Sequence, residues 1–139
     1  GTSPGPPAIP AAWLPSLGGL AAVFGHVYPL YHGFRGGKGA ATLVGALLAI
    51  VPALVPVMIG VWLLTVVLTG FVGLATMVAA AALPIVVAFG DVAPRAPLLA
   101  FGLFAAAFVV FTHRSNVARM LAGTEPRARR LWLLGRGTR

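Results

Sequence analysis

The chain has 139 residues, of which 59% are hydrophobic and only 9% are charged, a composition that excludes an ordinary soluble domain and indicates a membrane protein. Ten Lys and Arg residues against two acidic ones give a formal net charge of +8; with two carboxylates and no cysteine, the chain lacks residues for disulfides, thiolate chemistry or an oxygen-rich metal site. We expect one integral-membrane domain with no metal and no cofactor, and no nucleic-acid partner, because the cations lie in a short loop and a tail rather than over a folded surface.

The first predicted span follows a short start. We expect residues 1–10 to be an extended or truncated start, since they lack the basic region of a signal peptide. A span is predicted over residues 11–31, interrupted by Pro15 and by the pair Gly18–Gly19. This segment begins the membrane-embedded part of the chain, which we place at residues 11–113.

The long apolar stretch over residues 40–90 is too long for one crossing, which takes roughly 17 to 25 residues. Prolines and glycines near residues 52–56 and 70–73 divide it into three spans. A last span is predicted from about residue 97 to residue 112. The fold class is therefore all-α, a polytopic transmembrane bundle with about five spans.

The charge pattern predicts the orientation of these spans. Four crossings separate the cationic loop at residues 35–38 from the seven arginines in residues 114–139, so both groups lie on one side of the membrane. The bias of Lys and Arg towards cytoplasmic loops identifies this side as cytoplasmic. Residues 114–139 are accordingly expected to form a basic cytoplasmic tail.

The loop within residues 25–42 has the composition of an anion site. Glycines beside Arg35 and Lys38 let backbone N–H groups turn towards an anion, and the positive end of the helix that follows points to the same place. It is not a Walker A loop, because Gly39 stands where Ser or Thr would be needed. The alternative is an interfacial turn with snorkelling cations, in which His26 is a hydrogen-bonding residue at a helix end.

A second polar segment covers residues 112–125. His113 and Asn116 are three residues apart and share one face of a continuing helix, so both side chains can point into the bundle, whereas Arg114 lies off that face. The alternative is a span that merely ends in cytoplasmic arginines, which explains Arg114 but not the two neutral polar residues. Glu125 is the only carboxylate among these arginines, and we expect it to form a bracing ion pair.

Together the two segments resemble the second and third motifs of the bacterial integral-membrane acyl-phosphate:glycerol-3-phosphate acyltransferases, the PlsY family. The first pattern is met by Gly25, His26, Tyr28, Pro29, Arg35, Gly36, Gly37, Lys38, Gly39, Ala41 and Thr42. The second is met by His113, Arg114, Asn116, Arg119, Gly123 and Glu125. Two long motifs in the right order make the resemblance specific.

The resemblance covers about residues 16–130. The family normally has seven spans, and its first two, with the loop that carries a further motif, have no counterpart here, so the chain resembles the C-terminal two-thirds of such an enzyme. An inactive membrane fragment is one alternative, and a small polytopic transporter is another. A transporter would carry ionisable residues inside its spans, and residues 39–90 contain none. Acyltransferases of the His-x4-Asp type are disfavoured because no histidine here has that partner.

The resemblance implies transfer of a fatty acyl group from acyl-phosphate to the 1-hydroxyl of sn-glycerol 3-phosphate, which forms lysophosphatidic acid in the first acylation step of phospholipid biosynthesis. It implies a multi-pass protein of the bacterial inner membrane, whose partners are the two substrates, the lipid bilayer and the soluble enzyme that makes acyl-phosphate. A mixed anhydride has a good leaving group, so positioning and charge stabilisation suffice without a metal.

The resemblance also implies roles for individual residues. His113 and Asn116 would orient the acceptor or the acyl-phosphate beside the reacting carbonyl, and His26 is a catalytic candidate of the same kind. Glu125 would be structural. Thr76 would supply the hydroxyl that the family often takes from a serine near Gly73. The expected substrate-binding residues are Arg35, Gly36, Gly37, Lys38, Gly39, Thr76 and Arg114.

Overall fold

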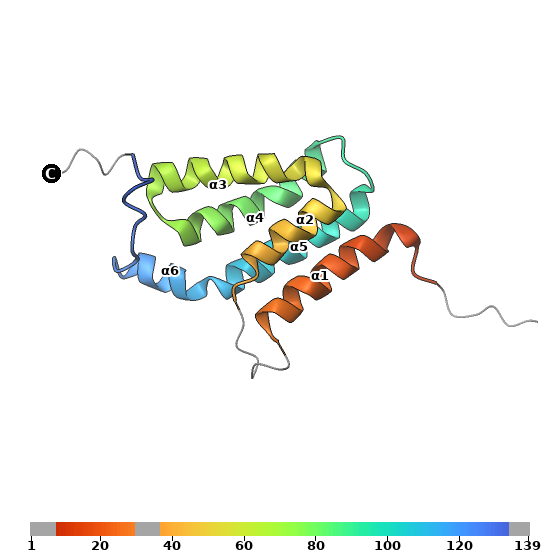
Figure 1. Ribbon diagram of the computed structural model, residues 1–139, viewed down its shortest axis with the longest axis horizontal. Helices are drawn as coiled ribbons and strands as arrows, with labels where there is room; N and C mark the ends of the chain where they lie inside the picture. Colours follow the sequence, from red (N-terminus) through yellow and green to blue (C-terminus); the bar gives the residue numbers. More distant parts are fainter. Residues whose placement is uncertain (1–7, 30–36, 134–139) are drawn as a thin grey trace, which may run out of the picture.

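The computed structural model describes residues 8–29 and 37–133. All regular elements in these ranges are helical: η1 (Ala11–Trp13), α1 (Leu14–Val27), α2 (Ala40–Ile50), η3 (Pro52–Leu54), α3 (Val55–Thr69), α4 (Val72–Phe89), α5 (Arg95–Thr112) and α6 (Arg114–Leu121). In Figure 1, α3 lies beside α4, and α6 extends from the end of α5; α5 packs against α4, and α1 packs against α2 and α5. The predicted all-α class is confirmed.

Glycine and proline set the helix boundaries. Helix α2 ends at Ile50, and Pro52 begins the short η3 that leads into α3. Helix α3 is followed by Gly70, whose φ of 77° is left-handed and is adopted by glycine without strain. The three helices predicted within residues 40–90 are therefore confirmed as α2, α3 and α4.

The interruption predicted in the first span is wrong. Helix α1 runs without a break through Pro15 and Gly18–Gly19. Pro15 lies in the first turn, where a missing N–H costs no helical hydrogen bond. Gly19 is instead a close-packing position, because a Cβ there would lie 2.9 Å from Cδ1 of Ile50 and 3.0 Å from Cε2 of Phe101.

The five predicted spans correspond to five apolar helical stretches. Three of those described, Pro52–Thr69, Val72–Phe89 and Arg95–Thr112, are long and apolar enough to cross a membrane. The other two, Ala11–Val27 and Ala40–Ile50, are apolar but shorter. Many large apolar side chains point outwards along these helices, as expected for a surface that lies in lipid.

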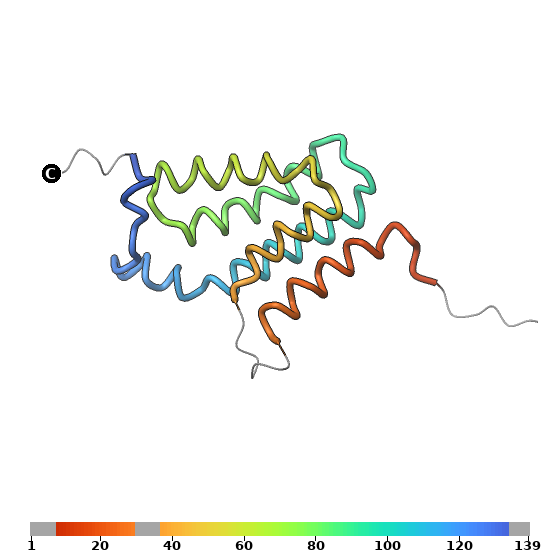
Figure 2. The backbone as a smooth tube through the Cα atoms, viewed as in Figure 1, coloured from red at the N-terminus to blue at the C-terminus, as the bar shows by residue number. Residues whose placement is uncertain are grey.

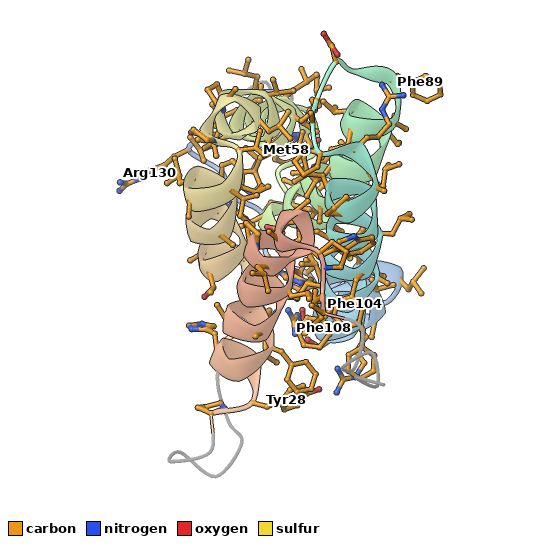
Figure 3. The ribbon with its side chains drawn as sticks, turned by 90° about the vertical axis from the view of Figure 1, so that its right-hand side faces the viewer. Tyr28, Met58, Phe89, Phe104, Phe108 and Arg130 are labelled. Carbon is orange, nitrogen blue, oxygen red and sulfur yellow. The ribbon has the colours of Figure 1, made fainter. Side chains whose placement is uncertain are left out.

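The buried core draws on α1 to α5, and many of its most fully buried side chains lie between α4 and α5. Leu83, Val87, Leu98 and Phe101 are fully buried there. Gly102 lets the two helices approach closely, since a Cβ on it would lie 3.2 Å from the backbone nitrogen of Pro84. At the edge of α5, Phe104 and Phe108 form a ring cluster that reaches Phe24 of α1 and Tyr28, which directly follows α1 (Figure 3).

The segment after α6 turns back towards the junction of α3 and α4 (Figure 2). The N–H of Ala128 donates to the carbonyl of Gly70 at 2.8 Å, and the N–H of Leu133 donates to that of Val67 at 3.1 Å. The guanidinium of Arg127 stacks on Phe71 and Trp132. The described part of the expected tail is therefore a short helix and a segment packed on the bundle.

Candidate functional site

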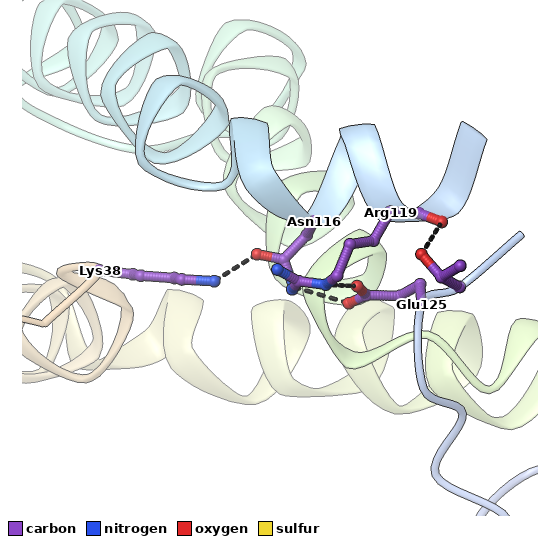
Figure 4. Close-up of polar contacts among 5 residues, drawn as sticks. Lys38, Asn116, Arg119 and Glu125 are labelled. Carbon is purple, nitrogen blue, oxygen red and sulfur yellow. Dashed lines mark hydrogen bonds and ion pairs between the residues drawn. The ribbon is translucent and has the colours of Figure 1, made fainter. Parts of the chain in front are cut away.

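Four polar side chains form a connected chain where α6 meets the start of α2 (Figure 4). The ammonium of Lys38 donates a hydrogen bond to Oδ1 of Asn116. Nδ2 of Asn116 donates to Oε1 of Glu125 at 2.7 Å, and Nε of Arg119 donates to Oε2 of the same carboxylate at 2.6 Å. Two segments 78 residues apart are thus joined through one amide, which confirms that they lie at the same end of the bundle.

The local backbone positions Asn116 on one side of this hydrogen-bonded network and Lys38 on the other. Helix α5 ends at Thr112, and His113 separates it from α6. Asn116 therefore lies in the first turn of α6. On the other side, Gly39 has a left-handed φ of 80° immediately before α2. A Cβ on Gly39 would approach Val23 and Val27 of α1 to 3.1 Å, so the turn after Lys38 is packed directly on α1.

Glu125 lies at the centre of the charge network. Its side chain is only 4% exposed, whereas that of Arg119 is 43% exposed. Burial alone would raise the pKa of Glu125, but hydrogen bonds from Asn116 and Arg119, together with the charges of Arg119 and Lys38, hold it below the ordinary value. The carboxylate is therefore ionised at neutral pH and fixes the orientation of the Asn116 amide.

His113 is buried beside this chain, with 4% of its surface exposed. Its Nδ1 lies 2.8 Å from the carbonyl oxygen of Val109, which can only accept, so Nδ1 carries the proton. Burial lowers the pKa of His113 and the charge of Lys38 adds to this effect, which together outweigh the hydrogen bond to Val109 and the charge of Glu125. The ring is therefore neutral near pH 7, with Nε2 as an unprotonated acceptor.

Gly73 of α4 lies directly against the Asn116 amide. A Cβ on this glycine would lie 2.6 Å from Nδ2 and 2.8 Å from Cγ of Asn116. The sequence indicated Gly73 as part of a break between spans and as a residue that lacks a hydroxyl. Its structural importance is the space that it leaves for the amide.

The variant Gly73→Ala is expected to lower the melting temperature in detergent, even though alanine is the better helix former. The added methyl group pushes Asn116 away from Glu125, and a buried carboxylate that loses a donor costs about 1 to 3 kcal/mol. Gly60→Ala in α3 is the matched control, because a Cβ there meets nothing within 4 Å. Equal melting temperatures for the two variants would contradict this account of Gly73.

Other predicted site residues lie outside the chain of four. Arg114 donates to the carbonyl of Phe111 at 3.0 Å and stacks on its ring at 4.4 Å, so it points along α5. His26 is close to the loop, since its Nε2 lies 2.5 Å from where a Cβ on Gly37 would be. Arg35 and Gly36 lie outside the described residues.

Thr76 lies in an apolar groove between α2, α3 and α4. Its hydroxyl accepts a hydrogen bond from Nε1 of Trp62 at 3.2 Å and donates to the carbonyl of Val72 at 3.0 Å. The groove has a volume of about 230 Å³ and is lined by residues that include Ala40, Leu43, Leu47, Met58, Trp62 and Thr76. Ala40 is two residues beyond Lys38, and Thr76 is one helical turn beyond Gly73, so the groove adjoins the polar chain.

Among residues 8–29 and 37–133, no three His, Asp or Glu side chains lie together in an arrangement that could hold a metal ion. The polar chain therefore offers one ammonium, one amide, one buried carboxylate with its arginine, and a neutral imidazole nearby. Such groups can hold an anion and orient a hydroxyl group.

A family model described as glycerol-3-phosphate acyltransferase matches residues 6–123. The glycerol-3-phosphate acyltransferase of Chlorobium limicola is 37% identical over 134 aligned residues, which cover 80% of this chain and 57% of that protein. That of a Synechococcus species is 41% identical over 125 residues, covering 90% of this chain and 62% of that protein. The chain thus spans about three-fifths of the length of these relatives.

Crystal structures of PlsY (YgiH), an integral membrane glycerol 3-phosphate acyltransferase, are similar to this fold. The glycerol 3-phosphate form aligns with a TM-score of 0.75 at 34% identity, covering 83% of this chain and 56% of that one. The lysophosphatidic acid form aligns with a TM-score of 0.74 at the same identity, covering 83% and 58%.

Proposed function

Because the chain belongs to the glycerol-3-phosphate acyltransferase family, we propose that the protein transfers a fatty acyl group from acyl-phosphate to sn-glycerol 3-phosphate. The products are lysophosphatidic acid and phosphate. The observation that carries the proposal is the polar chain from Lys38 to Glu125 beside an apolar groove, since the reaction joins a small anion to a long hydrocarbon chain. The proposal concerns the whole protein. This chain spans about three-fifths of the length of such a relative.

The reaction needs positioning rather than a strong catalyst. The hydroxyl oxygen of glycerol 3-phosphate attacks the acyl carbonyl carbon, the new ester C–O bond forms, and the C–O bond to phosphate breaks. The hydroxyl proton leaves on the released phosphate, so atoms and charge balance without a redox partner. Because the donor is an activated mixed anhydride, correct placement of the two substrates and stabilisation of charge supply the rate enhancement.

Lys38 is the cation that we assign to the phosphate of glycerol 3-phosphate. A lysine ammonium has three donors, and Asn116 takes one of them, which leaves two for phosphate oxygens. In the sequence, Lys38 is flanked by glycines at 36, 37 and 39 and follows Arg35, a composition that suits a phosphate site with Arg35 as a second cation. Asn116, fixed by Glu125, keeps the ammonium directed towards the site.

His113 is the residue that we assign to the reacting hydroxyl. Its neutral Nε2 can accept a hydrogen bond from the 1-hydroxyl while the loop holds the phosphate of the same molecule. His26 lies beside Gly37 and is a second candidate on the loop side. A direct contact of Arg114 with substrate would require its side chain to leave Phe111.

The apolar groove is the place that we assign to the acyl chain. Thr76 is a polar residue in its lining, and its position one turn from Gly73 puts it near the polar chain. A donor with its hydrocarbon chain along α2 and α4 would then present its phosphate to the site. The clustering of basic residues favours an orientation with this end of the bundle cytoplasmic, in the bacterial inner membrane, where the soluble enzyme that makes acyl-phosphate can deliver it.

The direct test is an assay in lipid nanodiscs, carried out on this chain and on the longer protein of its relatives' length. With palmitoyl-phosphate and glycerol 3-phosphate, we expect equimolar formation of lysophosphatidic acid and phosphate. Palmitoyl-CoA serves as the control donor and is expected to give no product. The proposal is rejected if the longer protein is inactive with palmitoyl-phosphate, whereas activity of the longer protein alone would identify the chain as an inactive part of the enzyme.

A further inference from the structure

Both the side chain and the backbone of Lys38 form hydrogen bonds with the junction of α5 and α6. Its ammonium donates to Asn116, and its backbone carbonyl accepts a hydrogen bond from Oγ1 of Thr112 at 3.0 Å. Thr112 is the last residue of α5, directly before His113. One short segment therefore contacts the loop residue at two separate points.

The other hydrogen bonds of this junction show where the Thr112 proton goes. Besides the carbonyl of Lys38, the hydroxyl lies 3.0 Å from the carbonyl of Val109 and 3.3 Å from Nδ1 of His113. The Val109 carbonyl already accepts from the backbone N–H of His113 at 3.0 Å and from Nδ1–H of the same residue at 2.8 Å. A carbonyl oxygen has two lone pairs, so the Thr112 proton is directed to Lys38.

We propose that Thr112 is a positioning residue that sets the distance between Lys38 and His113. The inference rests on the proposed function, in which Lys38 holds the phosphate of glycerol 3-phosphate and His113 contacts its 1-hydroxyl. These two groups of the substrate are joined by a short three-carbon backbone, so the residues that bind them must be held at a matching separation. Thr112 does this because it is bonded covalently to His113 and by hydrogen bond to Lys38.

The first test uses the fact that Lys38 is the only lysine of the chain. Thr112→Val removes the hydroxyl with little change in shape, and Thr112→Ser keeps it. Acetylation of Lys38 by acetic anhydride in nanodiscs, followed by mass spectrometry of the peptide, is expected to be about 3- to 10-fold faster in Thr112→Val than in the native protein, the range for loss of one neutral hydrogen bond. Thr112→Ser is expected to match the native rate. Equal rates in all three proteins would overturn the inference.

The second test is kinetic and uses the same variants. Thr112→Val is expected to raise KM for glycerol 3-phosphate by about 3- to 10-fold, with KM for palmitoyl-phosphate unchanged and Thr112→Ser near native. A merely structural role would lower the amount of active enzyme and leave KM unchanged, which would refute the positioning role. If the longer protein transfers no acyl group, the proposed function fails, and the reactivity of Lys38 still decides whether Thr112 holds Lys38 in place.

Discussion

Alanine in place of Lys38 is expected to raise KM for glycerol 3-phosphate by about 10- to 150-fold, the equivalent of one charge-assisted hydrogen bond worth about 1.5 to 3 kcal/mol. The ammonium is the only lysine cation of the chain, and it is already directed towards the site by Asn116. The effect should fall on the acceptor, because in the proposed function the acyl chain of the donor would lie in the groove and would gain most of its binding from apolar contact. Steady-state kinetics with each substrate varied in turn separates the two KM values.

The matched control for this variant is Arg95→Ala. Arg95 is an exposed cation at the opposite end of α5, where it donates to the carbonyl of Gly90 at 2.8 Å. Its loss is expected to change either KM by less than about twofold, the size of a typical surface effect. A Lys38→Ala protein with native KM and native kcat would remove Lys38 from the proposed site.

Alanine in place of Asn116 is expected to lower kcat/KM by at least about 100-fold, because the change removes the hydrogen bonds that connect Lys38 to Glu125 through Asn116. The buried Glu125 carboxylate loses one of its two donors, and Lys38 loses the acceptor that orients it. The protein is also expected to lose about 1 to 3 kcal/mol of stability. Kinetics and thermal unfolding in nanodiscs measure the two effects, and Ser115→Ala, at the exposed neighbouring position, is the control.

A pair of exchanges tests the direction of the bond between Asn116 and Glu125. Asn116→Asp still accepts from Lys38 but places a second carboxylate against Glu125 and cannot donate to it. Adding Glu125→Gln restores one hydrogen bond, donated in the opposite sense, and removes the repulsion. The double variant should therefore recover part of the stability and activity lost in Asn116→Asp. A double variant that is as impaired as the single one, or more so, would argue against the proposed role of the Asn116–Glu125 hydrogen bond.

The sequence was sufficient for the helices because their limits depend on local chemistry. Pro52 and Gly70 lie at two of these limits, and the apolar runs between them leave few alternatives. Gly18–Gly19 misled the prediction for the same reason. A glycine pair predicts a helix break, whereas packing against Ile50 and Phe101 makes Gly19 an interface residue of an intact helix.

The candidate site could be predicted only in part. The three-residue spacing of His113 and Asn116 correctly indicated that both would face the interior, and both are buried. The contact of Glu125 with Asn116 depends on a reversal of the chain after α6, where Gly123 has a left-handed φ of 70° and the N–H of Thr124 returns to the carbonyl of Arg119. Gly123 is a local signal for a helix end of this kind, but it does not specify that Glu125 then meets Asn116.

The longest-range contacts were beyond sequence reasoning for a different reason. The bonds from Lys38 to Thr112 and Asn116 depend on how α2 and α5 are placed by their packing on α1 and α4. The importance of Gly73 likewise comes from the Asn116 amide that packs against it. These features arise from tertiary packing, which a periodic pattern along one helix does not encode.

The rim of the apolar groove has a consequence for how the fatty chain would travel. Val44 of α2 and Ile59 of α3 line the groove and are also exposed on the outer surface of the bundle, at 39% and 46%. A groove with such a rim opens sideways to the hydrocarbon of the bilayer rather than upwards to water. Passage of an alkyl chain through water costs about 0.8 kcal/mol per methylene. With lateral entry and exit, a long-chain donor and its lysophospholipid product would avoid that barrier, and turnover would depend on sideways diffusion in one leaflet.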